Sequence, residues 1–353
     1  MAALYIYYID HLTGRIKGGA ECVKYSFSRD IDFKDKSTAV VTERPGIDND
    51  DIVVINEGAK RILAGVCESI STGSAPYTLN ILPIENIFDR TIFAQNESLI
   101  SGTGMEDFIR MVIVQNFISS GDSLFDKSYM SATAATHTRI STTVASTVNS
   151  ENGVYNFKTF LGNVLQYYGI GLDFTIGNGS TAISVKKDPK APLLIDTRFT
   201  DVEGFQETYD VRVLAKLAVR WKNTNTSAVT SRTFYLQEDR SITENASSAT
   251  RVSGTVESVY IETGTEAEML QEVRNQFTSN SYSHSMSMNI AKSSKIYSPE
   301  DLYVGRKVRI RSGKTGLITE TIITRKTESS ENEIQKITLG KLPVTLIDKI
   351  RRL

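Results

Sequence analysis

The chain contains few residues of the types that form catalytic or metal sites. It has three histidines, His11, His137 and His284, and none of them lies near another histidine or a cysteine at the spacing of zinc ligands. A Ser–His–Asp triad can join residues that are distant in the sequence, but no Gly-x-Ser-x-Gly motif supports one. We therefore expect a protein that is not an enzyme, with no catalytic residue, no cofactor and no metal ion.

Two glycine-containing segments resemble nucleotide-binding loops only in part. Gly313-Lys314-Thr315 ends like a P-loop, but that motif requires a glycine where this chain has Val308. It also requires a following helix, whereas Leu317–Ile323 is rich in β-branched residues and is expected to form a strand. Gly169-Ile170-Gly171 ends a predicted helix and lacks the third glycine of a dinucleotide fingerprint. Neither segment predicts a nucleotide site.

The acidic residues show no catalytic pattern. Asp48-Asn49-Asp50-Asp51 lacks the glycine and the distal glutamate of a calcium loop, so we expect it to rim a turn. A cell-wall or polysaccharide hydrolase needs only two carboxylates, and 41 Asp and Glu make such pairs unavoidable. A hydrolase therefore stays an alternative. A receptor- or glycan-binding module is another, because Tyr5, Tyr7 and Tyr8 can stack on sugars.

The composition is that of a globular protein with several domains. With 353 residues, 23% of them charged and 40% hydrophobic, the chain is too long for one ordinary core. The net charge of −1 provides no overall field for nucleic acid or membranes, although residues 301–353 are basic. We expect a soluble protein made in a cytoplasm, because no signal peptide and no apolar run of membrane-spanning length is present. Cys22 and Cys67 are expected to be buried free thiols.

The order of predicted elements divides the chain into three parts. Residues 1–100 alternate apolar and polar side chains in short runs, which predicts an N-terminal β-barrel module. Residues 101–190 are predicted to be an inserted α/β domain that ends at a proline-containing boundary. Residues 191–353 are predicted to be a second β-module with an inserted helix near 265–278, opened by a Thr265-x-x-Glu268 capping box. The expected fold class is α+β, dominated by β-structure.

Within the inserted α/β domain, two helices and a hairpin are predicted. Residues 105–117 and 157–168 have apolar side chains at helical spacing, and Asn156 can cap the second helix. Strands follow at 173–176 and 182–186, around a Gly-Asn-Gly turn. Residues 119–152, which are rich in Ser and Thr, are expected to form a long exposed loop.

One pattern occurs near both ends of the chain. Residues 52–63 and 307–318 each consist of a strand, a polar loop with one glycine, and a returning strand. Val53 and Ile55 correspond to Val308 and Ile310. Any two hairpins share such a pattern, but a β-module that occurs twice explains it as well, and repeats indicate architecture.

The sequence resembles the tail-tip hub proteins of tailed bacteriophages. The resemblance rests on the segment DIVVINEGAKRILAGVCESIS, on an α/β insert, and on the closing segments LYVGRKVRIRSGKTGLITETIITRK and IQKITLG. In siphophages these are the tail-associated, or baseplate hub, proteins, and in contractile tails they are similar to the central hub. The resemblance covers roughly the whole chain, but its motifs are hairpins without catalytic residues.

The resemblance implies a function and partners. It implies a structural virion protein of the phage tail, made in the bacterial cytoplasm, in which a homotrimer with two β-barrels per subunit gives six similar positions. It further implies contact with the distal tail protein and the tape-measure protein, and passage of DNA through a lumen during entry into the host cell. It supplies no site residues. The basic hairpin 306–314 is a candidate for a lumen or interface segment.

Overall fold

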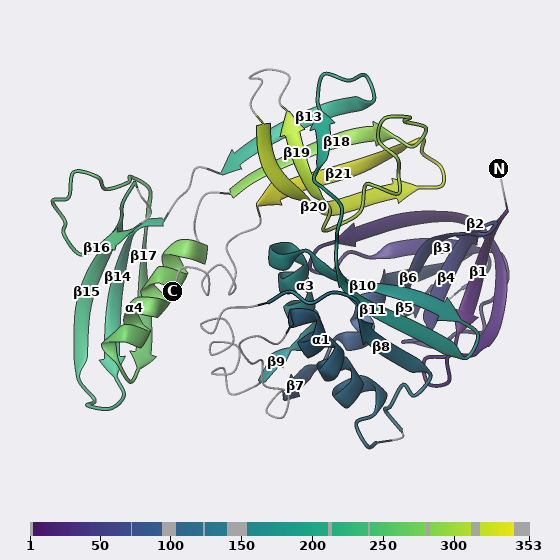
Figure 1. Ribbon diagram of the computed structural model, residues 1–353, viewed down its shortest axis with the longest axis horizontal. Coiled ribbons are helices and arrows are strands. Elements are labelled where there is room, and N and C mark those ends of the chain that lie inside the picture. Colours follow the sequence, from purple (N-terminus) through teal and green to yellow (C-terminus); the bar gives the residue numbers. More distant parts are fainter. Residues whose placement is uncertain are drawn as a thin grey trace. The chain divides into compact units, whose positions relative to one another are not determined.

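The computed structural model describes residues 3–71, 73–93, 104–122, 124–139, 154–210, 214–238, 241–279, 283–311 and 318–341 (Figure 1). The chain divides into two compact units. The first comprises Met1–Phe205 and Ser287–Leu339, and the second comprises Gln206–Met286 and Gly340–Leu353. The fold is α+β and dominated by β-structure, as the sequence predicts.

The N-terminal part of the first unit is a closed ring of six strands. These strands are β1 (Leu4–Ile9), β2 (Ile16–Asp30), β3 (Ser37–Val41), β4 (Ile52–Glu57), β5 (Lys60–Ile70) and β6 (Tyr77–Pro83). Their order is β1-β4-β5-β6-β3-β2, and β1 also pairs with β2, which closes the ring. Every pair in it is antiparallel. Closure satisfies the backbone hydrogen bonds that an edge strand would leave open.

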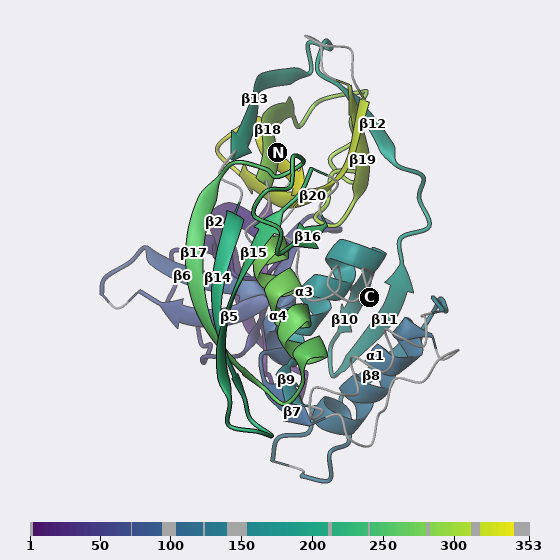
Figure 2. The same cartoon turned by 90° about the vertical axis from the view of Figure 1, so that its left-hand side faces the viewer.

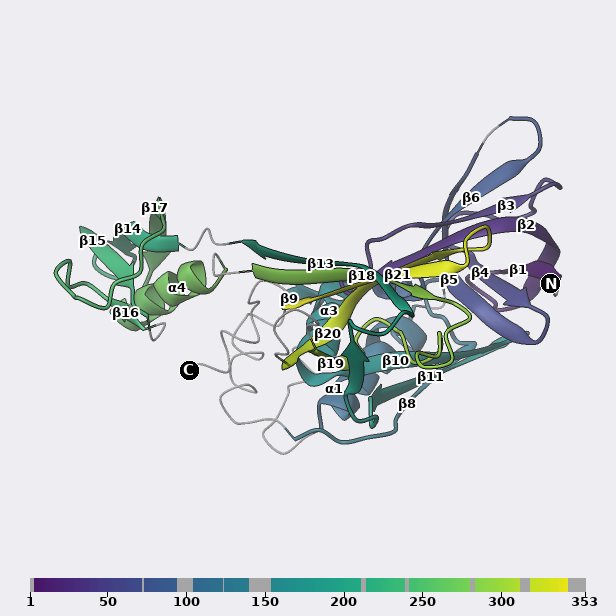
Figure 3. The ribbon, with the colours of Figure 1, turned by 90° about the horizontal axis from the view of Figure 1, so that it is seen from above.

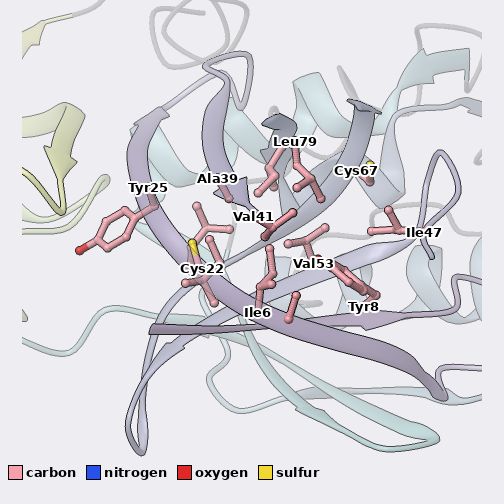
Figure 4. Close-up of a cluster of buried hydrophobic side chains, with 14 residues drawn as sticks. Ile6, Tyr8, Cys22, Tyr25, Ala39, Val41, Ile47, Val53, Cys67 and Leu79 are labelled. Atoms are coloured by element: carbon pink, nitrogen blue, oxygen red, sulfur yellow. The ribbon is translucent and has the colours of Figure 1, made fainter. Parts of the chain in front are cut away.

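The interior of this ring is a core of alternating apolar side chains (Figure 4). Ile6 and Tyr8 point inward from β1, and Val53 and Ile55 do so from β4, at the two-residue period of a strand. At Gly65, an added Cβ would lie 2.3 Å from the carbonyl oxygen of Leu82, so β5 and β6 approach too closely there for any side chain. Cys22 and Cys67 are free, buried thiols, as expected. The other core residues are Ala20, Cys22, Tyr25, Ala39, Val41, Ile47, Leu63, Cys67, Leu79 and Ile81.

A second set of six strands repeats this order. It consists of β12 (Leu193–Asp196), β13 (Val202–Asp210), β18 (Ser283–Ala291), β19 (Lys307–Arg311), β20 (Ile318–Ser329) and β21 (Ile334–Lys341). Their order in the sheet is β12-β19-β20-β21-β18-β13. When the six strands of each set are numbered 1 to 6 in the order in which they occur along the chain, both sets have the spatial order 1-4-5-6-3-2. The hairpins 52–63 and 307–318 thus contribute the fourth and fifth strands of their sets.

The two sets form one continuous sheet. Residues 26–30 of β2 pair antiparallel with residues 325–329 of β20. The seam is reinforced by a hydrogen bond from the Ser330 backbone N–H to the Tyr25 carbonyl oxygen, at 3.0 Å. Two ion pairs also cross it, Arg325 with Asp35 and Lys24 with Glu331.

An α/β segment lies between the two sets in sequence. It contains 3₁₀ helix η1 (Ile84–Phe88), β7 (Thr91–Phe93), α1 (Met105–Ile113), π-helix η2 (Val114–Ile118), β8 (Met130–Ala134), β9 (Val154–Asn156), α3 (Phe157–Tyr168), β10 (Ile170–Gly177) and β11 (Ser180–Lys187). Phe88, Phe117 and Phe157 pack edge-to-face and stacked at its centre, with ring centroids 5.0–6.0 Å apart. Arg61 of β5 donates a hydrogen bond to the Phe174 carbonyl oxygen at 2.7 Å, which ties the segment to the first ring.

Local sequence signals in this segment are confirmed, with one correction. Asn156 caps α3 by accepting a hydrogen bond from the Thr159 backbone N–H, and Gly169 ends the helix in the left-handed conformation. The turn between β10 and β11 also lies where predicted. The prediction of one long loop over 119–152 is wrong in part, because β8 pairs in parallel with β11. Residues 140–153 of that segment lie outside the described residues.

The second unit is a four-stranded sheet with one helix against it (Figure 2). It consists of β14 (Leu214–Asn223), β15 (Val229–Leu236), β16 (Ile242–Thr243), β17 (Thr255–Thr263) and α4 (Glu266–Ser279), and the sheet order is β16-β15-β14-β17. The capping box is confirmed, since Thr265 and Glu268 exchange hydrogen bonds. Met269, Val273 and Phe277 are buried, whereas Ala267 is exposed. The chain enters this unit from β13 and leaves it into β18, which run side by side (Figure 3).

Candidate assembly interface

The arginines of the basic hairpin singled out from the sequence have acidic partners within the chain. Arg306 is buried and donates hydrogen bonds to the carbonyl oxygens of Lys190 and Ala191, and its guanidinium lies 3.2 Å from a carboxylate oxygen of Asp188. A hydrogen bond from Tyr303 and the neighbouring Arg306 hold the pKa of Asp188 below its ordinary value, although burial acts in the opposite direction. This cluster joins the end of the α/β segment to the start of β19.

The remaining arginines of the hairpin also face acidic partners. Arg309 lies 2.6 Å from Glu320 across the hairpin, and Arg311 lies 3.8 Å from Asp196 of β12. The pKa of Asp196 is lowered to about 2, chiefly by its hydrogen bond with Arg198. Gly313-Lys314-Thr315 lies outside the described residues, and the segment after it is strand β20, not the helix of a P-loop. The described part of the hairpin therefore belongs to the sheet, and each of its three arginines lies beside a carboxylate of the same chain.

The acidic run at residues 48–51 does more than rim a turn. Asp51 is fully buried, and its carboxylate accepts hydrogen bonds from Lys17 at 2.8 Å and from the His11 backbone N–H at 3.0 Å. The His11 ring nitrogen Nδ1 also lies 3.0 Å from it. Burial alone would raise the pKa of Asp51, but these hydrogen bonds outweigh burial and lower it. The cluster fastens the β1–β2 turn to the strand that begins at Ile52.

None of these groups has the electrostatics of a hydrolase acid. Wherever a carboxyl pKa is clearly displaced in the described part of the chain, it is displaced downward, so these groups stay ionised at neutral pH. A glycosidase needs one carboxylic acid with a raised pKa. His137 faces Asp107 at 2.6 Å on the surface, and the His284 side chain lies outside the described residues. No cluster of potential metal ligands occurs among the described residues.

Exposed apolar side chains, which mark interaction surfaces, gather in several places. In the α/β segment, Leu124 and Phe125 are 76% and 65% exposed. The carboxylate of Asp126 holds the loop beneath them by accepting hydrogen bonds from the Ser120 hydroxyl and from the backbone N–H groups of Ser120 and Gly121. A loop held in this way presents two large apolar side chains to solvent at a small cost in conformational entropy. Sequence reasoning missed it, although an aspartate shortly after Ser-Gly is a turn signal.

Further exposed apolar residues lie on the other parts of the chain. In the second set of strands they are Leu194, Phe199 and Ile296, and in the second unit they are Val229, Val256 and Tyr260. The tyrosines near the N-terminus differ in burial. Tyr8 lies in the core, while Tyr5 is 41% exposed, and the ring centroids of Tyr5 and Tyr7 lie 4.9 Å apart. No helix in the described part of the chain is long and apolar enough to cross a membrane.

Comparison with known proteins gives the fold a context. No protein-family description matches the chain. No curated protein matches it either. Among solved structures, the baseplate of phage p2 in its activated conformation, with calcium, is similar at a TM-score of 0.57 and 11% identity, over 96% of this chain and 98% of that one. A topological description of the p2 virion baseplate in the same conformation gives a TM-score of 0.54 at 10% identity, with the same coverage. The fold is that of phage tail and baseplate proteins, as the sequence resemblance indicated.

Proposed function

We propose that this chain is a structural component of a phage tail tip, a baseplate hub that forms a homotrimeric ring. The observation that carries the proposal is the strand order 1-4-5-6-3-2, which occurs twice in one chain and is joined through β2 and β20. The likeness to phage p2 baseplate structures over 96% of the chain supports it. The proposed domains are residues 1–100, 101–190 and 191–353, with the two β-modules at the ends.

The repeat has a physical consequence for assembly. Three chains with two similar modules each place six similar surfaces around one axis, although the chains themselves obey only threefold symmetry. Such a ring can join a sixfold tail tube to a threefold tip. In this proposal the distal tail protein and the tape-measure protein are its neighbours, and DNA crosses its lumen when the phage enters the host cell.

The second set of strands has features of a surface that is completed by assembly. Within the described residues, β12 pairs only with β19 and β13 only with β18, so both strands lie at edges. Edges of this kind are liable to pair with other chains unless they are covered. The exposed residue Leu194 lies on β12, and the exposed residues Phe199 and Ile296 lie in the connections between β12 and β13 and between β18 and β19. We infer that a neighbouring subunit covers this side.

Two measurements test the proposal. Light scattering of the purified protein across about 1–100 μM is expected to show a species three times the 39.1 kDa chain. Electron microscopy of that species is expected to show a ring with six similar lobes under threefold symmetry. A chain that stays monomeric and is also missing from purified tails, as judged by immunolabelling, contradicts the proposal. Hydrolysis of cell wall by the purified protein contradicts it as well.

A further inference from the structure

Among the described residues, a helix covers only one face of the sheet of the second unit. Helix α4 packs with Met269, Val273 and Phe277 against Leu217 and Phe234, and the residues that complete this core are Leu214, Val219, Leu236 and Ile261. Because side chains alternate along a strand, the neighbours of these residues point to the opposite face. On that face Arg251, from the loop before β17, stacks on Tyr235, which is buried, while Val229, Val256 and Tyr260 are exposed.

The register of the three long strands defines that open face. Lys216, Ala218, Arg220 and Lys222 of β14 are aligned with Tyr235, Thr233, Ser231 and Val229 of β15. On the other side, the same four residues are aligned with Val256, Ser258, Tyr260 and Glu262 of β17. Val229, Val256 and Tyr260 are 48%, 63% and 53% exposed. The open face, defined as these twelve residues, therefore has large apolar groups on both sides of a basic row.

The charges of the unit are separated between its two sides. On the open face, Lys216 and Arg220 have no ion pair among the described residues, Lys222 pairs with Glu262, and Arg251 stacks on the Tyr235 ring at 4.1 Å. The open face and the Arg251 stacked on it therefore carry four cationic side chains and one carboxylate.

The helix side has the opposite balance. Glu257 shares the face of Leu217, and Glu266, Glu268 and Glu272 lie on α4. Glu244 lies beside Arg232, which also reaches Glu266. The cationic side chains of this side in the described residues are Arg232 and Arg274. The helix side therefore carries five carboxylates and two cations.

We propose that the second unit makes a head-to-tail contact with the second unit of another copy, the open face of one copy packing on the helix side of the next. This inference rests on the proposed homotrimer. The two surfaces of one chain are complementary in charge, which favours a copy of the same chain as the occupant of the open face. A contact between two different surfaces repeats from copy to copy, and it closes into a ring when the rotation between copies is 120°.

The size of the face sets the strength of the contact. Three strands about 4.8 Å apart, each about eight residues long at about 3.3 Å per residue, give a face on the order of 400 Å². A stable interface buries about 800 Å² on each partner. The contact therefore does not hold two isolated units together and forms only within the larger ring. Its test requires the full chain in the assembled trimer.

Cross-linking with a short bismaleimide tests the geometry. Val256→Cys places a thiol on the open face and Ala267→Cys places one on the exposed side of α4, whereas the native Cys22 and Cys67 are buried. A trimer mixed from the two single variants is expected to give cross-linked dimers, and the double variant is expected to give a ladder that ends at three chains. The unmodified chain, as control, gives neither product.

Charge reversal tests whether the complementary charges of the two surfaces stabilise the contact. Lys216→Glu with Arg220→Glu reverses the charge of the open face and is expected to lower the cross-linking yield about tenfold. Glu257→Lys with Glu272→Lys reverses the charge of the helix side and is expected to lower the yield by the same factor. Combining all four substitutions is expected to restore it. Lys34→Glu with Lys295→Glu, two exposed sites in the first unit, serves as the matched control and leaves the yield unchanged.

The outcomes separate this inference from the proposed function. Cross-linking of Val256→Cys to itself indicates a face-to-face contact and overturns the inference. Absence of cross-links between chains in a trimer verified by light scattering overturns it too, since the open face then packs on its own chain or on another tail protein, while the proposed hub stands. Failure of the unmodified chain to form trimers, with its absence from tails, overturns the proposed function itself.

Discussion

The closed ring of β1–β6 and the second set of strands have the same order but differ at one strand. In the ring, β1 runs antiparallel to β4 and pairs with β2. In the second set, the corresponding β12 runs parallel to β19, and its described residues show no pairing with β13. The remaining five strands keep their neighbours. A repeated topology therefore tolerates reversal of its first strand, and in the described residues the set with the reversed strand is not closed.

The two hairpins also differ in how their strands are buried. In β4, Ile52, Val53, Val54 and Ile55 are all buried, because the ring core lies on one side and other side chains cover the opposite one. In β19, Val308 and Ile310 are buried while Lys307 and Arg309 are exposed. A continuous apolar run is typical of a strand covered on both faces, and alternation is typical of one with a solvated face. Strand β4 is thus enclosed on both faces by its own chain, whereas one face of β19 is solvated.

The largest expected effect comes from truncating the equivalent isoleucines. Ile55 and Ile310 are 0% and 2% exposed, and each occupies the fourth strand of its set. Ile55→Ala is expected to lower the free energy of unfolding by about 4 kcal/mol and Ile310→Ala by about 2–3 kcal/mol, because an open sheet relaxes around a cavity more easily. Denaturant unfolding of the full chain measures both. A larger loss for Ile310→Ala contradicts the comparison.

Protonation of the buried aspartates is expected to have a smaller effect. The pKa of Asp51 is lowered from its ordinary value of 3.8, so its contribution to stability is complete above that pH and is lost as the pH falls through the lower pKa of the folded protein. Asp51→Asn is expected to cost about 2 kcal/mol at pH 7, because Lys17 and His11 lose a charged partner. The free energy of unfolding of this variant is also expected to fall less between pH 4 and lower pH than that of the unmodified chain. Unfolding series at pH 7 and pH 3 measure this.

Asp196, at the end of β12, is a buried aspartate of the second set. Its pKa of about 2 predicts that its contribution is lost between about pH 4 and pH 2. Asp196→Asn is therefore expected to reduce the acid sensitivity of the second set and to leave that of the first ring unchanged. Hydrogen exchange of β19 and β4 amides at low pH distinguishes the two. Equal changes in both strands would show that the sets unfold as one unit.

The smallest expected effect lies at the seam between the two sets. Arg325 pairs with Asp35 on the surface, beside the backbone ladder of β2 and β20. Because exposed ion pairs contribute little, Arg325→Ala is expected to cost at most about 1 kcal/mol, and Glu331→Gln less. A cost above about 2 kcal/mol, measured by denaturant unfolding, would show that the ion pair and not the strand ladder holds the sets together.

Local signals in the sequence were sufficient for individual elements. Signals that depend on residues within a few positions of one another were predictable. They are the helix cap at Asn156, the helix end at Gly169, the capping box of Thr265 and Glu268, and the positions of both hairpins. The repeated pattern of residues 52–63 and 307–318 matched Val53 and Ile55 with Val308 and Ile310, and all four are buried in the fourth strands of their sets.

What the sequence could not decide depends on segments that are far apart along the chain. Burial of Asp51 follows from the approach of Lys17 and His11, and the parallel pairing of β8 with β11 spans about fifty residues. The free face of β14 follows from which side α4 covers. Periodicity along a strand shows that two faces differ, but only the tertiary structure shows what lies against each of them. The sequence alone therefore determined many of the elements and suggested the repeat, while the folded chain showed that the strand order occurs twice, which set is closed, and which face of β14 the helix α4 covers.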